Sequence, residues 1–301
     1  MTRLRPPTSA NTMLGLSLAI AGNAVFSIQD AVVKWLVADY TVWQVLFMRS
    51  VTIAMIALIF AWRTAVRGIL ASPNRPALLF RAVVMLTAWL CYYNAARALK
   101  LPDLVTLYYA SPLFVTVLSI LVLGERVNLA RWVAVSIGFV GVVIAANPTG
   151  RPDLAPALLV LVAAFLWGWS NILMRRISAS ENTQTQMLFT NGAFILMCGV
   201  TMPFFWRQPD GFELLLMLGI GITSGIGQYC VYESVRHAPA SLVAPCSYTA
   251  LVWSFLWGFL IWGDLPEQTV LAGASLILSG SVIVVVSEWR RRRKPGVARA
   301  A

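Results

Sequence analysis

Long apolar stretches alternate with short polar breaks along the whole chain. A membrane-spanning helix needs roughly 20 mainly apolar residues. The pattern predicts ten such helices, over residues 13–36, 41–62, 77–98, 103–123, 130–146, 155–176, 184–206, 213–235, 240–262 and 267–288. Every break between them is short and rich in turn-forming residues, so we expect no inserted soluble domain.

The chain is organised around the stretch from Tyr92 to Glu125, in which a polar turn separates two apolar segments. Pro112 lies inside the second segment. A helix-interior proline leaves the carbonyl of Tyr108 without its donor and bends the helix there. Within a bilayer, loosened backbone survives only against protein or a wet cavity. We therefore expect a polar, aromatic cavity at the level of Tyr108 to Pro112.

Composition agrees with the helix pattern, because 59 % of the 301 residues are hydrophobic and only 12 % are charged. An ordinary soluble domain carries about 25 % charged residues. The first apolar stretch leads into a polytopic chain and not into a cleavage site, so we expect no removed signal peptide. The four cysteines lie in apolar stretches without the spacing of a metal site or a disulfide framework, so no metal is expected.

The basic residues, which give a net charge of +11, lie in short loops and in the tail. This distribution argues against nucleic acid as a partner. Ten spans place both termini on one side of the membrane. If that side is the cytoplasm, 17 Lys and Arg residues are inside and 5 outside, as the positive-inside rule requires. The basic tail is expected to contact anionic lipid.

The second half of the chain repeats the first. After a shift of 139 residues, CYYNAAR at 91–97 falls on CVYESVR at 230–236, and the 54 positions 91–144 contain ten identities. In this register Glu125 matches Asp264, and a two-residue adjustment matches Lys34 with Arg175. Five helices in each half force the halves into opposite orientations, which is typical of secondary transporters. We predict repeats at 1–147 and 148–288 and a cytoplasmic tail at 289–301.

Three motifs carry a resemblance to a known family: FLWGWSNILMRR at 165–176, SPLFVTVLSILVLGE ending at Glu125, and ALVWSFLWGFLIWGD ending at Asp264. They resemble the drug/metabolite transporter superfamily, in its EamA-type ten-helix form. The resemblance implies a multi-pass transporter of a bacterial-type inner membrane that exports small amphipathic metabolites by alternating access. The tyrosine and tryptophan content suggests amino acids, including aromatic ones. The first half departs from the family's Trp-Gly doublet, with Phe26 and Ser27 in its place.

In such a fold the first, third, fourth, sixth, eighth and ninth helices would wall a central cavity. The candidate substrate-binding residues on them are polar or aromatic: Ser27, Tyr92, Tyr109, Trp167, Asn171, Gln228, Tyr232 and Tyr248. A site that mixes aromatic faces with hydroxyls and amides suits a zwitterion with an apolar side chain. Because no nucleotide-binding loop is present, we expect that ATP hydrolysis by this chain does not drive transport and that no ATPase subunit is required. We also expect no cofactor and a monomeric protein.

Three charged residues, Asp30, Lys34 and Arg49, fall within the first two predicted spans. Charges inside a membrane are functional candidates by default. One interpretation is that Asp30 pairs with Arg49 or Lys34 and orders the two helices, with transport by facilitated diffusion. The other is that Asp30 couples transport to protons.

The alternatives to an amino-acid exporter are a different cargo and an enzyme. The same fold could carry a cationic drug or a nucleotide sugar. An enzyme is not expected, because the sequence has no HExxH, no Cys/His cluster and no Ser/His/Asp set, and has a single histidine.

Overall fold

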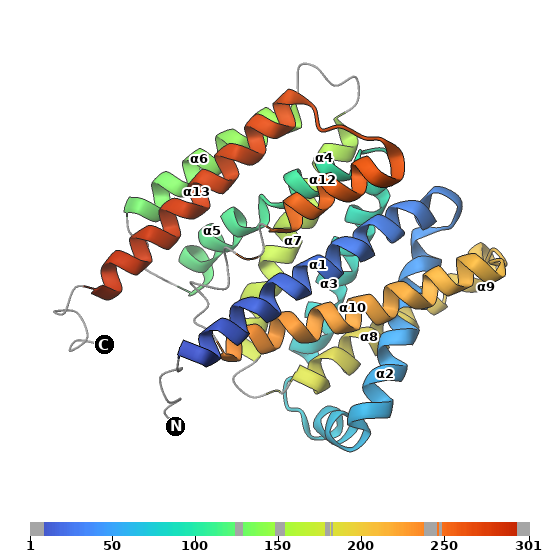
Figure 1. Cartoon of the computed structure of the whole chain (residues 1–301). Helices are drawn as coiled ribbons and strands as arrows, with labels where there is room; N and C mark the ends of the chain where they lie inside the picture. Colours follow the sequence, from blue (N-terminus) through green and yellow to red (C-terminus); the bar gives the residue numbers. More distant parts are fainter. Residues whose placement is uncertain are drawn as a thin grey trace.

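The structure, a computed structural model, describes residues 9–123, 129–147, 154–177, 181, 183–237, 246 and 249–293. These ranges form an all-helical bundle (Figure 1). Its helices are α1 (Ser9–Asp39), α2 (Val42–Ala71), α3 (Arg75–Ala96), α4 (Leu101–Tyr108), α5 (Ser111–Leu123), α6 (Leu129–Ala146), α7 (Ala155–Ile177), α8 (Thr183–Gly199), α9 (Met202–Phe205), α10 (Gly211–His237), α12 (Thr249–Trp262) and α13 (Gln268–Arg293).

Six helical segments of the described ranges are long and apolar enough to cross a membrane. They lie in α1, α2, α3, α7 and α10 and in the joined pair α4 and α5. Shorter apolar helices lie in α6, α12 and α13. The first turn of α1 and the last turn of α13 are at the same end of the bundle (Figure 1). The count of ten spans and the cytoplasmic side of both termini stay predictions.

The predicted interruption near Pro112 is confirmed. Helix α4 ends at Tyr108, Tyr109 and Ala110 form a turn, and α5 begins at Ser111. Pro112 is the second residue of α5, where a missing backbone N–H leaves no gap in the hydrogen-bond ladder. The Leu113 and Phe114 amides both donate to the Ala110 carbonyl, at 3.0 and 3.2 Å, so the chain resumes its helix directly after the turn.

The two halves of the chain pack by the same pattern. Helix α1 packs on α10, and its repeat counterpart α7 packs on α3. The counterparts α2 and α8 pack on each other, as do α6 and α13, which run side by side in Figure 1. Exchanging the halves leaves these four pairings unchanged, so the repeat seen in the sequence is also present in the main helix pairings.

Glycines let α6 and α13 approach closely. A Cβ added to Gly141 would lie 2.7 Å from the carbonyl oxygen of Gly273, and one added to Gly280 would lie 2.8 Å from that of Ala134. These contacts are with backbone atoms, which cannot move aside without separating the helices. Small residues at such positions are typical of helix pairs in membranes.

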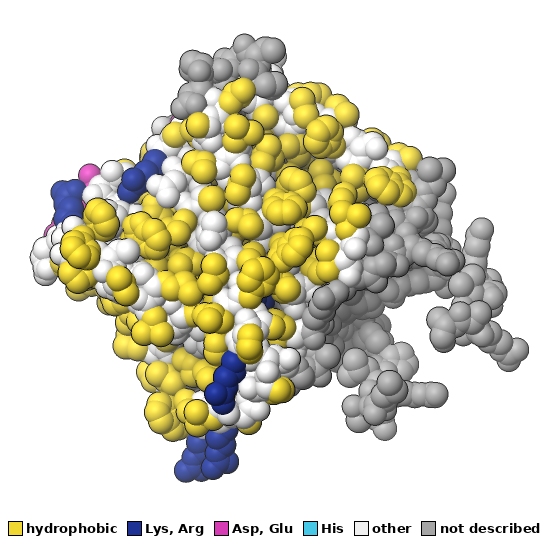
Figure 2. Space-filling model, turned by 180° about the vertical axis from the view of Figure 1, so that it is seen from behind, with side chains coloured by type: hydrophobic (Ala, Val, Ile, Leu, Met, Phe, Trp, Pro, Cys, Tyr) yellow, Lys and Arg dark blue, Asp and Glu magenta, His cyan; other side chains and the backbone are white. Residues whose placement is uncertain are grey.

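The outside of the bundle is apolar over wide areas. Ile59, Phe60 and Phe204 are 76 %, 84 % and 79 % exposed. Figure 2 shows a face on which hydrophobic side chains gather over most of the surface, with few charged ones among them. Because soluble proteins rarely expose large contiguous apolar patches, this surface is suited to lipid.

Candidate functional site

Five aromatic rings from three helices meet beside the break between α4 and α5. Trp89, Tyr92 and Tyr93 come from α3, Tyr108 is the last residue of α4, and Trp167 comes from α7. The ring centroids of Tyr92 and Tyr108 are 4.9 Å apart, and those of Trp89 and Trp167 are 5.8 Å apart. Trp167 also lies 6.3 Å from Tyr108. We call these five residues the aromatic cluster.

The local sequence explains how α3 contributes three rings. Trp89 precedes Tyr92 by three residues and Tyr93 by four, so one helix face carries it beside both tyrosines. Its centroid lies 6.0 Å from that of Tyr92 and 5.3 Å from that of Tyr93. The two tyrosine rings are 6.2 Å apart, and each of them contacts Trp89.

A buried cation lies against the cluster. The guanidinium of Arg49, on α2, is 4.5 Å from the ring centroid of Trp89. Its Nε donates a hydrogen bond of 2.8 Å to Ser224 Oγ on α10, and Ser224 in turn donates to Gln29 Oε1 on α1. Arg49, Ser224 and Gln29 are all buried. This chain of contacts joins two helices of the first repeat through one helix of the second.

Asp30 lies on the same helix as Gln29 and is linked to the same region. The Tyr92 hydroxyl hydrogen-bonds to its carboxylate, and Arg49 acts on that carboxylate through space. Asp30 and Arg49 are therefore near enough to interact electrostatically but do not form a direct salt bridge. Within the described ranges, the ion pairs do not include Asp30. Asp30 is thus an acidic group at the edge of an aromatic and cationic site.

The expected pairing of Lys34 with Asp30 is wrong. Lys34 Nζ lies 3.3 Å from Asp264 Oδ2, 230 residues away, and 4.8 Å above the ring of Trp262. Gly263 has a positive φ of 68° and ends α12 in a left-handed cap, in which the Gly263 amide donates to the Phe259 carbonyl at 2.9 Å and the Asp264 amide donates to the Gly258 carbonyl at 3.0 Å. That turn directs Asp264 toward α1, and this tertiary contact prevails over the one-turn spacing within α1.

Other predicted site residues make contacts that hold the helices. Ser27 Oγ accepts a hydrogen bond of 3.1 Å from Trp257 Nε1, which joins α1 to α12. Asn171 Nδ2 donates to the Trp167 carbonyl of its own helix at 3.0 Å. Gln228 is half-buried on α10. None of the three belongs to the aromatic cluster.

The predicted tyrosines have different outcomes. Tyr92 is in the cluster, as is Trp167. Tyr109 is a buried residue of the turn between α4 and α5 and packs in the main hydrophobic core. Tyr248 and the side chain of Tyr232 lie outside the described residues.

Sequence reasoning missed Trp89, Ser224 and Gln29, and it located the site at the level of Tyr108 without naming that residue as a candidate ligand. The spacing of three and four residues from Trp89 to the paired tyrosines would have identified Trp89. Tyr108 precedes the proline by four residues, which is the position where the helix loses its hydrogen bond. No local pattern points to Ser224, because its role depends on a contact with α2.

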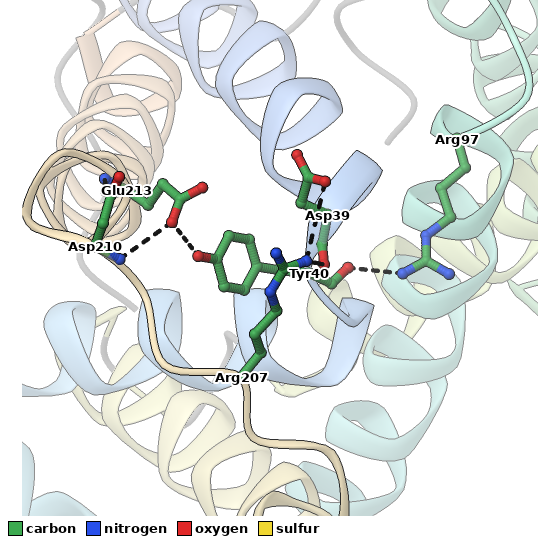
Figure 3. A network of polar contacts seen from close by, with 6 residues as sticks. All are labelled: Asp39, Tyr40, Arg97, Arg207, Asp210 and Glu213. Carbon is green, nitrogen blue, oxygen red and sulfur yellow. Dashed lines mark hydrogen bonds and ion pairs between the residues drawn. The ribbon is translucent and has the colours of Figure 1, made fainter.

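A second polar network lies at the link between α1 and α2 (Figure 3). The Tyr40 hydroxyl donates to Glu213, and the Arg97 guanidinium donates to the Tyr40 carbonyl at 2.7 Å. Arg207 lies 4.0 Å from the Asp39 carboxylate, and its backbone exchanges two hydrogen bonds with the Gln44 amide. The hydrogen bond to Glu213 raises the pKa of Tyr40 to about 12. The network anchors the segment before α10 to the first two helices.

The family model described as "EamA-like transporter family" matches the chain twice, at residues 13–147 and 154–286. A riboflavin transporter of Rhizobium johnstonii is 29 % identical over 98 % of this chain and 98 % of its own length. The pseudopaline exporter CntI of Pseudomonas aeruginosa is 27 % identical over 88 % of this chain and 93 % of its own length. A chain of known crystal structure matches with a TM-score of 0.65 at 21 % identity, covering 94 % of this chain and 99 % of that one, and supports the fold.

These relatives are transporters, which agrees with the expectation of a transporter and not an enzyme. The protein is a multi-pass protein of a bacterial-type inner membrane. Two consecutive family matches cover nearly the whole chain, and the chain therefore belongs to the EamA-like transporter family.

Proposed function

We propose that this protein exports small amphipathic metabolites by alternating access between its two repeats. The proposed cargo is amino acids, and the aromatic ones are expected to be preferred. The observation that carries the proposal is the aromatic cluster, in which rings from α3, α4 and α7 meet at an interrupted helix beside Arg49 and Asp30. Rings favour edge-to-face contact with other rings, and two opposite charges suit the two ends of a zwitterion. The composition is similar to that expected of the aromatic amino-acid exporter YddG.

A second cargo is favoured by the similarity to the riboflavin transporter, which extends over 98 % of both chains. Riboflavin has a flat ring system, and the cluster offers ring edges and faces that suit such a group. The two candidates share the ring and differ in the charged head group. A cationic drug or a nucleotide sugar is a further alternative for the same fold.

The test is uptake by proteoliposomes of a labelled panel of the twenty amino acids and riboflavin. We expect ring-bearing members to be taken up fastest. Trp167→Ala should reduce their uptake by up to roughly tenfold, because the loss of one aromatic contact with the cargo ring weakens binding by about 0.5–1.5 kcal/mol. Trp62→Ala is the matched control, since Trp62 is 59 % exposed on α2. Equal effects of the two substitutions would show that the cluster does not bind cargo.

The same vesicles test the coupling. We expect the wild type to equilibrate its substrate and not to concentrate it when a pH gradient is imposed, because Asp30 lies beside Arg49 and Tyr92 and is part of their arrangement. Folded Asp30→Asn should then keep the same response to the gradient as the wild type. Proton-driven accumulation that disappears in folded Asp30→Asn would instead make Asp30 the coupling residue.

A further inference from the structure

The bonding of Arg49 is incomplete. The residue is 6 % exposed, so nearly all of its side chain is removed from solvent. Of its five N–H groups, the one on Nε bonds to Ser224 at 2.8 Å, and the face of the guanidinium stacks on Trp89. Within the part of the chain that the structure describes, the two terminal amino groups have no further hydrogen-bond partner.

Two polar groups near Arg49 are fully buried without partners in the described part of the chain. The Gln29 amide nitrogen and the Tyr93 hydroxyl are buried and have no hydrogen-bond partner among the described residues. Gln29 is joined to Arg49 through Ser224, and Tyr93 makes an edge-on contact with Trp89, the tryptophan beneath the Arg49 guanidinium. Burying a polar group without a partner costs free energy, and burying a charge costs far more. Two buried groups without partners among the residues described, next to a cation that makes one hydrogen bond, indicate that acceptor oxygens enter this place during the working cycle.

Other residues do not supply those oxygens. The Asp30 carboxylate interacts with Arg49 through space and is hydrogen-bonded by the Tyr92 hydroxyl, and the ion pairs within the described ranges do not join it to Arg49. Lys34, the other cation of this region, is already neutralised by Asp264 at 3.3 Å. Arg49 therefore differs from Lys34. Its guanidinium contacts a serine and an aromatic ring, and no direct carboxylate contact neutralises its charge among the described residues.

We propose that Arg49 binds the carboxylate of the cargo, with Ser224 as its positioning residue, so that the protein selects ring-bearing carboxylates over their neutral analogues. A planar guanidinium whose Nε is already bonded still presents its terminal amino groups to a carboxylate. The cargo ring then lies toward Trp89, Tyr108 and Trp167, on the side where the guanidinium meets the cluster. This inference rests on the proposed function and names the anionic group that its cargo must carry.

The experiment compares two matched probe pairs in proteoliposomes: L-tryptophan with L-tryptophanamide, and indole-3-propionate with indole-3-propionamide. Each pair keeps the ring and replaces the carboxylate by a neutral amide. We expect wild-type uptake to favour the carboxylate at least tenfold, the scale of one charge-assisted hydrogen-bonded contact. Because this arm alters the probe and not the protein, it does not depend on whether any variant folds.

The protein variants are Arg49→Gln, Arg49→Lys and Ser224→Ala, with Arg63→Gln, an exposed position on the same helix, as control. Arg49→Gln should lose the preference, and Arg49→Lys should keep part of it because it retains the charge but not the planar fork. Ser224→Ala should weaken the preference severalfold by freeing the guanidinium, and Arg63→Gln should keep it. Each preference is a ratio measured on the same protein, so a lower folded yield leaves it unchanged.

A wild type that takes up carboxylate and amide equally well overturns the inference and leaves the proposed function standing. The same holds if folded Arg49→Gln keeps the wild-type preference. A wild type that takes up neither member of either pair overturns the proposed function, and this inference with it.

Discussion

Lys34 and Asp264 provide the most direct test of how the two repeats are joined. Lys34 lies on α1 in the first repeat, and Asp264 follows α12 in the second. Their side chains are 13 % and 19 % exposed and their charged atoms are 3.3 Å apart. The perturbation is a double-mutant cycle of Lys34→Met, Asp264→Asn and the combination of both.

The expected magnitude follows from the geometry. Two unit charges at this distance attract by about 5 kcal/mol at an effective dielectric constant of about 20. Desolvation of both groups and their partial exposure offset much of this attraction. A hydrogen bond to a charged group contributes about 1.5–3 kcal/mol net. We therefore expect a coupling free energy of roughly 2 kcal/mol.

The assay is unfolding of the purified protein in mixed micelles with increasing SDS, followed by circular dichroism. Each single variant should lower the free energy of unfolding, and the double variant should lower it by less than the sum. Asp39→Asn, at the exposed 4.0 Å pair with Arg207, is the control and should have an effect near zero. Additive effects of Lys34→Met and Asp264→Asn would refute the pairing.

Three further predictions concern other parts of the structure. Tyr40→Phe should lower the melting temperature below pH 10, because it removes the hydrogen bond to Glu213. Since that bond raises the pKa of Tyr40 to about 12, the difference between the variant and the wild type should shrink as the pH rises from 10 through 12, and a difference that stays constant would contradict the prediction. Gly141→Ala should destabilise by about 1–3 kcal/mol through its contact with the Gly273 backbone, whereas Gly219→Ala, which meets nothing within 4 Å, should not; equal melting temperatures would refute the close packing of α6 and α13. A reporter that is active only in the periplasm, fused after Ala301, should give no signal, and a bright fusion would contradict the predicted topology.

The helices and the repeat could be predicted because both depend on local pattern. Apolar length predicts a helix in a membrane, and Pro112 predicts its interruption, because each acts through neighbouring residues alone. The predicted span 184–206 was less successful: α8 ends at Gly199, and Pro203 lies at the start of the separate short helix α9. Proline lacks a backbone N–H, so it interrupts a helix in its interior but is tolerated in the first turn of the next helix.

The partners of the charged residues could not be predicted from spacing. A one-turn spacing places Asp30 and Lys34 on one face of α1, but it does not fix which helix covers that face. In the fold, the end of α12 covers Lys34, and Tyr92 of α3 meets Asp30. The site residues that were missed, Ser224 above all, likewise depend on contacts between distant parts of the chain. Sequence therefore predicted an all-helical membrane protein with two repeats, while the side-chain partners required the tertiary structure.

The repeat predicts a counterpart of the Lys34–Asp264 pair on the other side of the membrane. In the repeat register Lys34 matches Arg175 and Asp264 matches Glu125, and neither of these two counterpart side chains is among those described. If the halves are inverted, Lys34 and Asp264 lie near the outer surface and their counterparts near the inner surface.

We predict that Arg175 and Glu125 form the equivalent inner pair and that the two pairs bias alternating access in opposite directions. Asp264→Asn should then favour opening to the outside, and Glu125→Gln should favour opening to the inside, because each removes an attraction at one end only. The measurement is labelling of a Ser27→Cys variant, in a background without its native cysteines, by a membrane-impermeant maleimide added to intact cells. Asp264→Asn should label severalfold faster than the parent and Glu125→Gln more slowly, whereas a change in the same direction for both would contradict the symmetric arrangement.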